Sequence, residues 1–134
     1  MITVVAALIR KDNKYLIAKR LYSKDVIAGK YEFPGGKLEP GESEEEAVVR
    51  EIKEEFGVTV KCERFVTNSM YRYPTRAIDL RLYECAYVSG TFMLTDHSEI
   101  KWVTFDQLEN YEFMPADEGL VNFLVTKWEH EIFW

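Results

Sequence analysis

Short apolar runs along the chain predict β-strands, because each run is bounded by polar or turn-forming residues. Residues 2–9 (ITVVAALI) and 14–18 (KYLIA) are two such runs, joined by a polar turn, and are typical of neighbouring strands. Three later segments are rich in β-branched and aromatic residues and are predicted as further strands: 58–70, 78–88 and 100–105. In the second of them apolar and polar positions alternate, which indicates one buried face.

Two segments have the signals of helices. Residues 43–56 carry a capping box at their start, formed by Ser43 and Glu46, and Gly57 stands where a helix end favours a left-handed residue. The apolar positions of this segment form one stripe. A second helix is predicted over residues 117–129, just after a proline.

The segment between the second strand and the first helix has no regular period. Residues 21–32 are predicted as an irregular loop, and Phe33-Pro34-Gly35-Gly36 as a turn whose glycines permit close backbone approach. The predicted order of elements along the chain is two strands, a helix, three strands and a helix. This order favours an α+β or layered α/β fold with helices on a mixed sheet. Without repeats or linkers, we expect one domain over residues 1–134.

Composition and charge exclude several classes of protein. The 134 residues are 47% hydrophobic and 14% aromatic, which is enough for a core and argues against disorder. A net charge of −6 argues against binding a nucleic acid polymer, but permits a small phosphorylated ligand if metal ions add positive charge. No run reaches the ~20 apolar residues of a membrane helix or shows a signal-peptide pattern, so we expect a cytoplasmic protein. Cys62 and Cys85 are predicted to be buried free thiols.

Glutamate is concentrated around the first helix, with eight residues between Glu39 and Glu55. On a helix, Glu51, Glu54 and Glu55 fall within an arc of roughly 100°. Converging carboxylates are the ligands that Mg²⁺ or Mn²⁺ requires. The alternative is a solvated acidic face, to which we assign the first-turn glutamates Glu44, Glu45 and Glu46.

The spacing around this helix decides between these interpretations. Gly36 is followed after five residues by Glu42, and after seven more by the run REIKEEFGV, which begins at Arg50. This pattern resembles the Nudix box at every fixed position, and a chance match over so many offsets is far rarer than for a short glycine motif. The resemblance implies the α/β/α layered Nudix fold and a Mg²⁺-dependent hydrolase, with Mn²⁺ as the second choice of metal.

The Nudix resemblance also implies roles for individual residues. Metal ligation is expected from the carbonyl of Gly36 and the carboxylates of Glu51, Glu54 and Glu55. Glu54 is the expected catalytic base, and Glu51 and Arg50 are expected to assist it. Arg50 is placed to pair with Glu42. A further catalytic carboxylate is expected after the box, from Asp96 or alternatively Glu99.

The run Glu32–Lys37 (EFPGGK) resembles the MutT-type nucleoside triphosphate pyrophosphohydrolases within this superfamily. By that resemblance, Arg20 and Arg76 face the triphosphate or sugar, Phe33 lies beside the base, and Asp117 binds the base edge. Lys37, like Lys19, contacts phosphate or is simply solvated. MutT has asparagine where this chain has Asp117, and aspartate there is similar to enzymes that cleave (d)CTP or oxidised purine nucleotides such as 8-oxo-dGTP.

Two other functions remain as alternatives. A Nudix hydrolase of ADP-ribose, dinucleotide polyphosphates or nucleotide sugars would use the same chemistry, whereas a nucleotide-sensing domain would lack some of the glutamates present here. His97 and His130 are expected at the surface or in structural hydrogen bonds. The apolar C-terminal residues either dock on the domain or form a dimer contact, so we expect a monomer or a homodimer.

Overall fold

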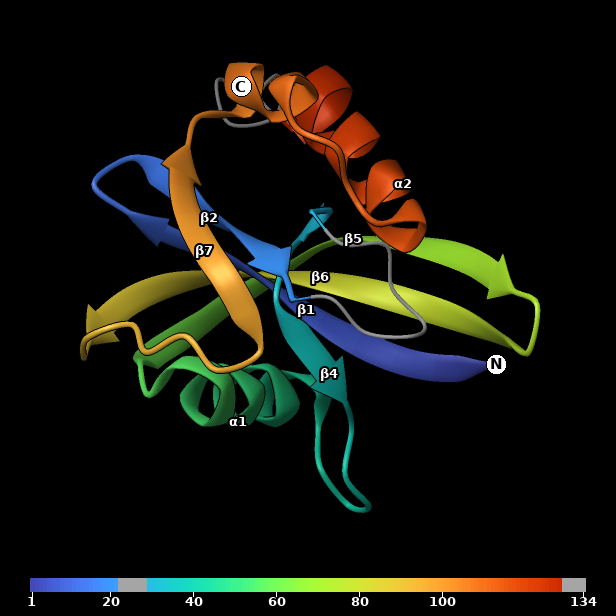
Figure 1. Ribbon diagram of the computed structural model, residues 1–134. Coiled ribbons are helices and arrows are strands. Elements are labelled where there is room, and N and C mark those ends of the chain that lie inside the picture. Colours follow the sequence, from blue (N-terminus) through green and yellow to red (C-terminus); the bar gives the residue numbers. More distant parts are fainter. Residues whose placement is uncertain (22–28, 129–134) are drawn as a thin grey trace.

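The computed structural model describes residues 1–21 and 29–128, drawn from the N-terminus to the C-terminus in Figure 1. In chain order the elements are β1 (Ile2–Lys11), β2 (Lys14–Arg20), β3 (Tyr31–Glu32), β4 (Gly35–Lys37), α1 (Glu44–Phe56), β5 (Thr59–Tyr73), β6 (Arg76–Ser89), β7 (His97–Val103), the 3₁₀ helix η1 (Phe105–Asn110), α2 (Pro115–Phe123) and the π-helical turn η2 (Leu124–Trp128).

The strands form one mixed sheet in the order β3-β2-β1-β6-β5, with β4 paired to β1 and β7 paired to β2. β1 runs parallel to β6 and antiparallel to β2 and β4. β1 and β2 pair only beside their turn, at Arg10↔Tyr15 and Lys11↔Lys14. Beyond these residues β1 pairs with β4, whereas β2 pairs with β3 and β7. Residues 31–37, which contain β3 and β4, therefore lie between the two diverging strands.

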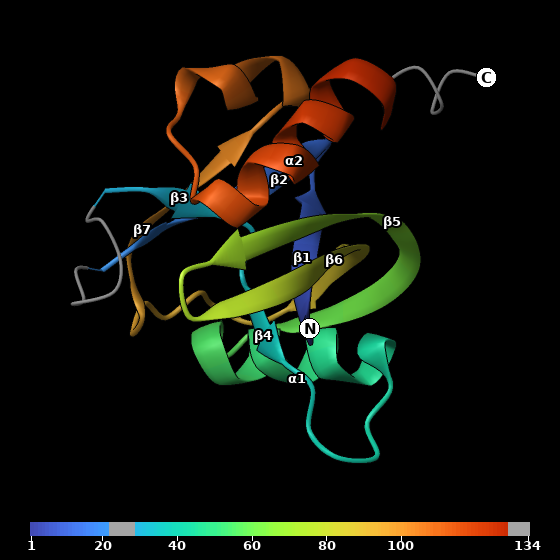
Figure 2. The same cartoon turned by 90° about the vertical axis from the view of Figure 1, so that its right-hand side faces the viewer.

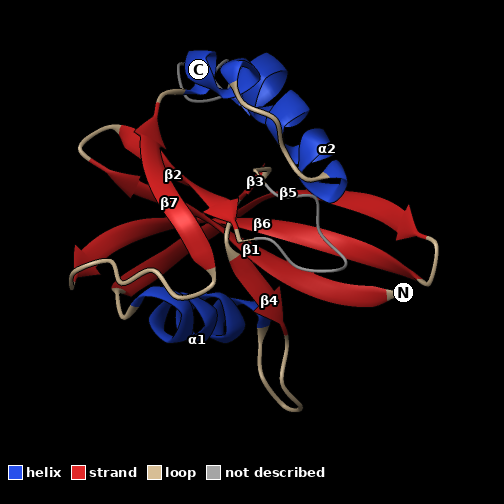
Figure 3. Ribbon diagram, viewed as in Figure 1, coloured by secondary structure: helices blue, strands red, loops and turns tan. Residues whose placement is uncertain are grey.

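The two helices cover opposite faces of the sheet, which gives three layers (Figures 1 and 2). Alternation along β1 divides its buried side chains between these layers. Val5 and Ala7 belong to the core beneath α1, together with Ile52 of that helix. Ala6 and Leu8 belong to the core beneath α2. The mixed sheet with helices on both faces confirms the predicted fold class (Figure 3).

The predicted capping signals of α1 are present. The Ser43 hydroxyl accepts the Glu46 amide at 3.1 Å, and the Glu46 carboxylate accepts the Ser43 amide at 2.9 Å. Gly57 ends the helix in the left-handed conformation, with φ 71°. Both ends of α1 therefore lie where the sequence predicts them.

Several predicted boundaries were wrong. Tyr31–Glu32 and Gly35–Lys37, expected to be loop and turn, are strands β3 and β4. The strand expected over 100–105 begins at His97 and ends at Val103, because a 3₁₀ helix starts at Phe105. The helix expected over 117–129 begins at Pro115, and its α-helical part ends at Phe123.

Some predictions fall outside the described residues. These concern part of the expected loop (22–28) and the last residues of the chain (129–134), including His130. Neither described α-helix combines the length and the hydrophobicity that crossing a membrane requires.

Candidate active site

A cleft of about 990 Å³ opens where strands β1 and β2 separate. Its walls come from the end of β2, the β3–β4 segment, the last turn of α1, the β5–β6 hairpin, the start of β7 and the start of α2. Eight of the residues predicted for the site line it: Arg20, Phe33, Gly36, Lys37, Glu55, Arg76, Asp96 and Asp117. Three others, Arg50, Glu51 and Glu54, are not part of this lining and stand next to it on α1.

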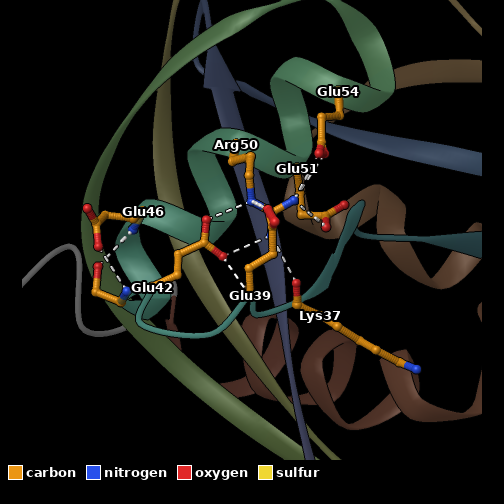
Figure 4. Close-up of polar contacts among 8 residues, drawn as sticks. Lys37, Glu39, Glu42, Glu46, Arg50, Glu51 and Glu54 are labelled. Atoms are coloured by element: carbon orange, nitrogen blue, oxygen red, sulfur yellow. Dashed lines mark hydrogen bonds and ion pairs between the residues drawn. The ribbon is translucent and has the colours of Figure 1, made fainter.

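Arg50 is the centre of the polar contacts on α1 (Figure 4). Its guanidinium donates to both oxygens of Glu42, at 2.6 and 2.9 Å, which confirms the predicted pair. It also contacts Glu51 and Glu54, each at 3.0 Å, and donates to the carbonyl oxygen of Lys37 at 3.0 Å. Hydrogen bonds from Arg50 lower the pKa of Glu42 to about 2, so this carboxylate stays charged.

Gly36 lies directly against the carboxylate of Glu51. A Cβ atom at Gly36 would lie 2.5 Å from the Cδ and one oxygen of Glu51. Because a real Cβ never approaches another heavy atom so closely, only glycine leaves Glu51 in this position. Gly35 has a different reason to lack a side chain, since its Cβ would lie 1.9 Å from the Val5 carbonyl oxygen in β1.

Glu55 differs electrostatically from its neighbours on the helix. Burial, followed by the charges of Glu32, Glu51 and Asp96, raises the pKa of Glu55 to about 9. Its Oε2 atom is buried and has no hydrogen-bond partner in the part of the chain that the structure describes. An oxygen that lacks a donor among several acidic groups fits a divalent cation, which would supply the missing positive charge.

The glutamates on α1 do not form a complete set of metal ligands in this structure. Among residues 1–21 and 29–128, no three His, Cys, Asp or Glu side chains converge closely enough to hold a metal ion. The contacts of Arg50 explain this arrangement, since Glu51 and Glu54 both direct oxygens to its guanidinium. The oxygen-rich donor set nevertheless has the chemistry that Mg²⁺ or Mn²⁺ prefers.

Asp117 forms a second polar group in the cleft, at the start of α2. It is 4% exposed, and its Oδ1 accepts the backbone N–H of Phe33 at 2.9 Å. Burial, and then the charge of Glu32, raises the pKa of Asp117 above its usual range. The Phe33 ring is itself buried and stacks on Phe113, with centroids 5.6 Å apart.

Comparison with known proteins establishes the family. Residues 1–125 match the NUDIX domain. The chain belongs to the Nudix family. It is 37% identical over 121 residues to the CTP pyrophosphohydrolase of Escherichia coli (strain K12), covering 90% of this chain and 89% of the relative. It is 31% identical over 118 residues to the 8-oxo-dGTP diphosphatase of the same organism, covering 88% and 92%.

A solved structure shows the same likeness in three dimensions. The MutT protein from Methanosarcina mazei Go1 superposes with a TM-score of 0.84 at 28% identity, covering 98% of this chain and 94% of that chain. The protein is a MutT-like Nudix hydrolase. Nudix hydrolases generally need a divalent metal ion, in agreement with the donor set around α1.

The two Nudix candidates for an additional carboxylate occupy different positions. Asp96 is exposed and lines the cleft, just before β7. Glu99 accepts a hydrogen bond from the Tyr31 hydroxyl and is not part of the cleft lining.

Sequence reasoning missed Glu32 as a member of the site. Glu32 pairs with Arg20 at 3.1 Å through Oε1 and with Nε2 of His97 at 2.7 Å through Oε2, and all three residues line the cleft. The EFPGGK run contains Glu32, but its partners Arg20 and His97 lie 12 and 65 positions away in the sequence, so no local pattern indicates these contacts. The expected hydrogen-bonded role of His97 is confirmed, since the imidazole is buried and paired.

Proposed function

We propose that this Nudix hydrolase cleaves a nucleoside triphosphate to the monophosphate and pyrophosphate, with (d)CTP or an oxidised purine nucleotide such as 8-oxo-dGTP as substrate. Two relatives support these options, since one is a CTP pyrophosphohydrolase and the other is an 8-oxo-dGTP diphosphatase. The observation that carries the proposal is a single cleft with the buried Asp117 carboxylate in its wall and the Nudix glutamates on and beside it.

Asp117 is suited to bind the edge of a base. One of its oxygens is engaged by the Phe33 amide, which holds the carboxylate in place and leaves the second oxygen for a ligand. A carboxylate accepts hydrogen bonds, so it suits the exocyclic amine of cytosine or the N1–H and N2–H₂ edge of a guanine. Unmodified adenine offers only one donor there. We assign Phe33 a place beside the base, where it also orients Asp117.

The metal in this proposal is Mg²⁺, with Mn²⁺ as the alternative. The ligands are the Gly36 carbonyl and the carboxylates of Glu51, Glu54 and Glu55. When bound, the ion supplies charge stabilisation for the phosphates and lowers the pKa of water.

Protein groups perform the other parts of the reaction. Glu54 accepts the proton of the attacking water, and Asp96 adds a further carboxylate at the cleft. Arg50 keeps the carboxylates of α1 in register through the contacts described above. Arg20, Arg76 and Lys37 contribute positive charge along the cleft for the triphosphate.

Hydrolysis of ADP-ribose, dinucleotide polyphosphates or nucleotide sugars is the second candidate. A non-catalytic nucleotide sensor is less well supported, since all four box glutamates are present: Glu42, Glu51, Glu54 and Glu55. We further propose that residues 1–134 act as one domain, as a monomer or homodimer, in the cytoplasm.

A pyrophosphate-release screen with Mg²⁺ tests the proposal. The panel comprises CTP, dCTP, dGTP, 8-oxo-dGTP and 2-hydroxy-dATP, with ADP-ribose and diadenosine polyphosphates beside them and EDTA as the metal-free control. A preference for cytosine or for an oxidised purine, measured as kcat/KM, supports the proposal. Activity confined to ADP-ribose or dinucleotides would refute it and keep only the Nudix chemistry.

A further inference from the structure

His97 occupies its position because the strand register shifts. Along β2 and β7 the pairs run regularly from Tyr15↔Val103 to Lys19↔Glu99, but the next pair is Arg20↔His97, which skips Ser98. Strict alternation would place His97 on the same face as Val103, beneath α2. The extra residue in β7 reverses the direction of the His97 side chain, which faces α1 instead. Bulges beside active sites often redirect a side chain in this way.

The imidazole is fixed on both its apolar and its polar side. It stacks on Phe56, the last residue of α1, with centroids 5.2 Å apart and planes 20° apart. His97 is 4% exposed, and its Nε2 lies 2.7 Å from Oε2 of Glu32. Its Nδ1 is buried and has no hydrogen-bond partner among residues 1–21 and 29–128, so within this part of the chain Glu32 is the one polar partner of the ring.

Glu32 divides its two oxygens between two partners. Oε2 binds His97, whereas Oε1 binds Nη1 of Arg20 at 3.1 Å. The Arg20 side chain is 39% exposed at the cleft, whereas that of Glu32 is 16% exposed. The contacts therefore run from the buried, stacked ring of His97 through the largely buried Glu32 carboxylate to the Arg20 guanidinium at the cleft.

We propose that His97 is a positioning residue for the Nudix reaction: it fixes the Glu32 carboxylate, and Glu32 holds the Arg20 guanidinium toward the triphosphate. This inference rests on the proposed function, which assigns Arg20 to the substrate. In the proposed function Arg20 holds the nucleotide by its charge and neither gives nor takes a proton, so loss of the contact should weaken binding more than it slows the chemical step.

The test compares two replacements of His97 under the pyrophosphate-release assay. His97→Phe keeps a ring on Phe56 and removes the hydrogen bond, whereas His97→Gln retains a donor for Glu32. We expect His97→Phe to raise KM about tenfold with kcat within about twofold, and His97→Gln to recover most of the loss. In an Arg20→Ala background, His97→Phe should raise KM no further.

Tyr31→Phe is the matched control. The Tyr31 hydroxyl also links β3 to β7, through Glu99, but this contact is outside the cleft lining. We expect unchanged kinetics for Tyr31→Phe. An equal KM increase in this control, or a His97→Phe effect that persists fully without Arg20, would show a purely structural role and overturn the inference.

A substrate-free readout separates this inference from the proposed function. The side-chain NMR resonance of Arg20 Nε–H should shift in His97→Phe and stay in place in Tyr31→Phe. An unshifted Arg20 resonance overturns the positioning role, whatever the substrate is. If the wild-type protein cleaves no nucleoside triphosphate, the proposed function fails, and a shifted resonance still supports the contact from His97 to Arg20.

Discussion

Replacing Gly36 by alanine should abolish most activity while leaving the fold nearly as stable as before. The new Cβ would lie 2.5 Å from the Glu51 carboxylate, whereas ordinary contact begins at 3.4 Å, so Glu51 has to move by about 0.9 Å. A displacement of about 1 Å in a catalytic group lowers activity about 100-fold, which corresponds to about 2.7 kcal/mol of transition-state stabilisation. The displaced atoms are the end of a flexible side chain, so unfolding free energy should change by less than about 1 kcal/mol.

The neighbouring glycine provides the control, because its clash is with backbone. A Cβ at Gly35 would lie 1.9 Å from the Val5 carbonyl oxygen, in the central strand β1. Backbone in a packed sheet cannot yield, so Gly35→Ala should destabilise by about 3 kcal/mol and lower Tm by about 10 °C.

Pyrophosphate release with Mg²⁺ and thermal unfolding of both variants decide the matter. We expect Gly36→Ala to lose activity with an almost unchanged Tm, and Gly35→Ala to lose Tm. The reasoning is refuted if Gly36→Ala retains kcat/KM within about threefold of wild type, since Glu51 would then tolerate the displacement.

Four further predictions concern the carboxylates and their partners. The pKa of Glu55 rises from 4.5 to about 9 on folding, so the folded protein binds a proton that the unfolded chain has lost, and stability should fall as pH rises through this interval. Thermal unfolding in EDTA should show this fall in the wild type and less of it in Glu55→Gln, whereas equal slopes would contradict the shift. Arg50→Lys cannot reproduce the forked contacts and should lower kcat/KM about 30-fold in the same kinetic assay, and near-normal turnover would exclude a positioning role. Glu54→Gln should lower kcat by about 100-fold or more, with the exposed Glu45→Gln unchanged, and comparable kcat in both would remove Glu54 as the base. Asp117→Asn keeps an acceptor for the Phe33 amide but presents a donor to the base. The kcat/KM for the preferred nucleotide should therefore fall about 100-fold relative to the other nucleotides of the panel. An unchanged order of preference would exclude Asp117 from base selection.

The sequence predicts those parts of the fold whose signals are local. The start and end of α1 follow from Ser43, Glu46 and Gly57, all of which act within a turn of the helix. Strands β3 and β4 have two and three residues, too few to show a period. These strands form because they pair with residues far along the chain, as in Val5↔Gly36. No local sequence pattern specifies such a pairing.

The candidate site likewise has contacts that the sequence predicts and contacts that it does not. The pair of Arg50 and Glu42 was predictable from the Nudix spacing, and the structure contains it. Arg50 also contacts Glu51 and Glu54, and the Nudix spacing, which predicts a single pair with Glu42, does not specify these two contacts. Angles along a helix thus place acidic positions on one side of it but carry no information on the cation that these carboxylates contact.

The Glu32–His97 contact shows a limit of reasoning from strand periodicity. The two residues are 65 positions apart, and a regular β7 would have directed His97 to the opposite face. Only the skipped Ser98 brings the imidazole to Glu32. A one-residue shift of register leaves no trace in composition or alternation, although it reverses which layer a side chain enters.

The carboxylates on α1 and just before it offset their like charges in two different ways. Glu42, Glu51 and Glu54 share one guanidinium, and for Glu42 the result is a lowered pKa. Glu55 has no such partner among the described residues, and burial instead raises its pKa to about 9, so that it carries a proton near neutral pH. A divalent cation at Glu55 must therefore displace that proton, which predicts tighter metal binding at higher pH. Arg50 therefore offsets the charge of one part of this acidic group, and protonation offsets that of Glu55.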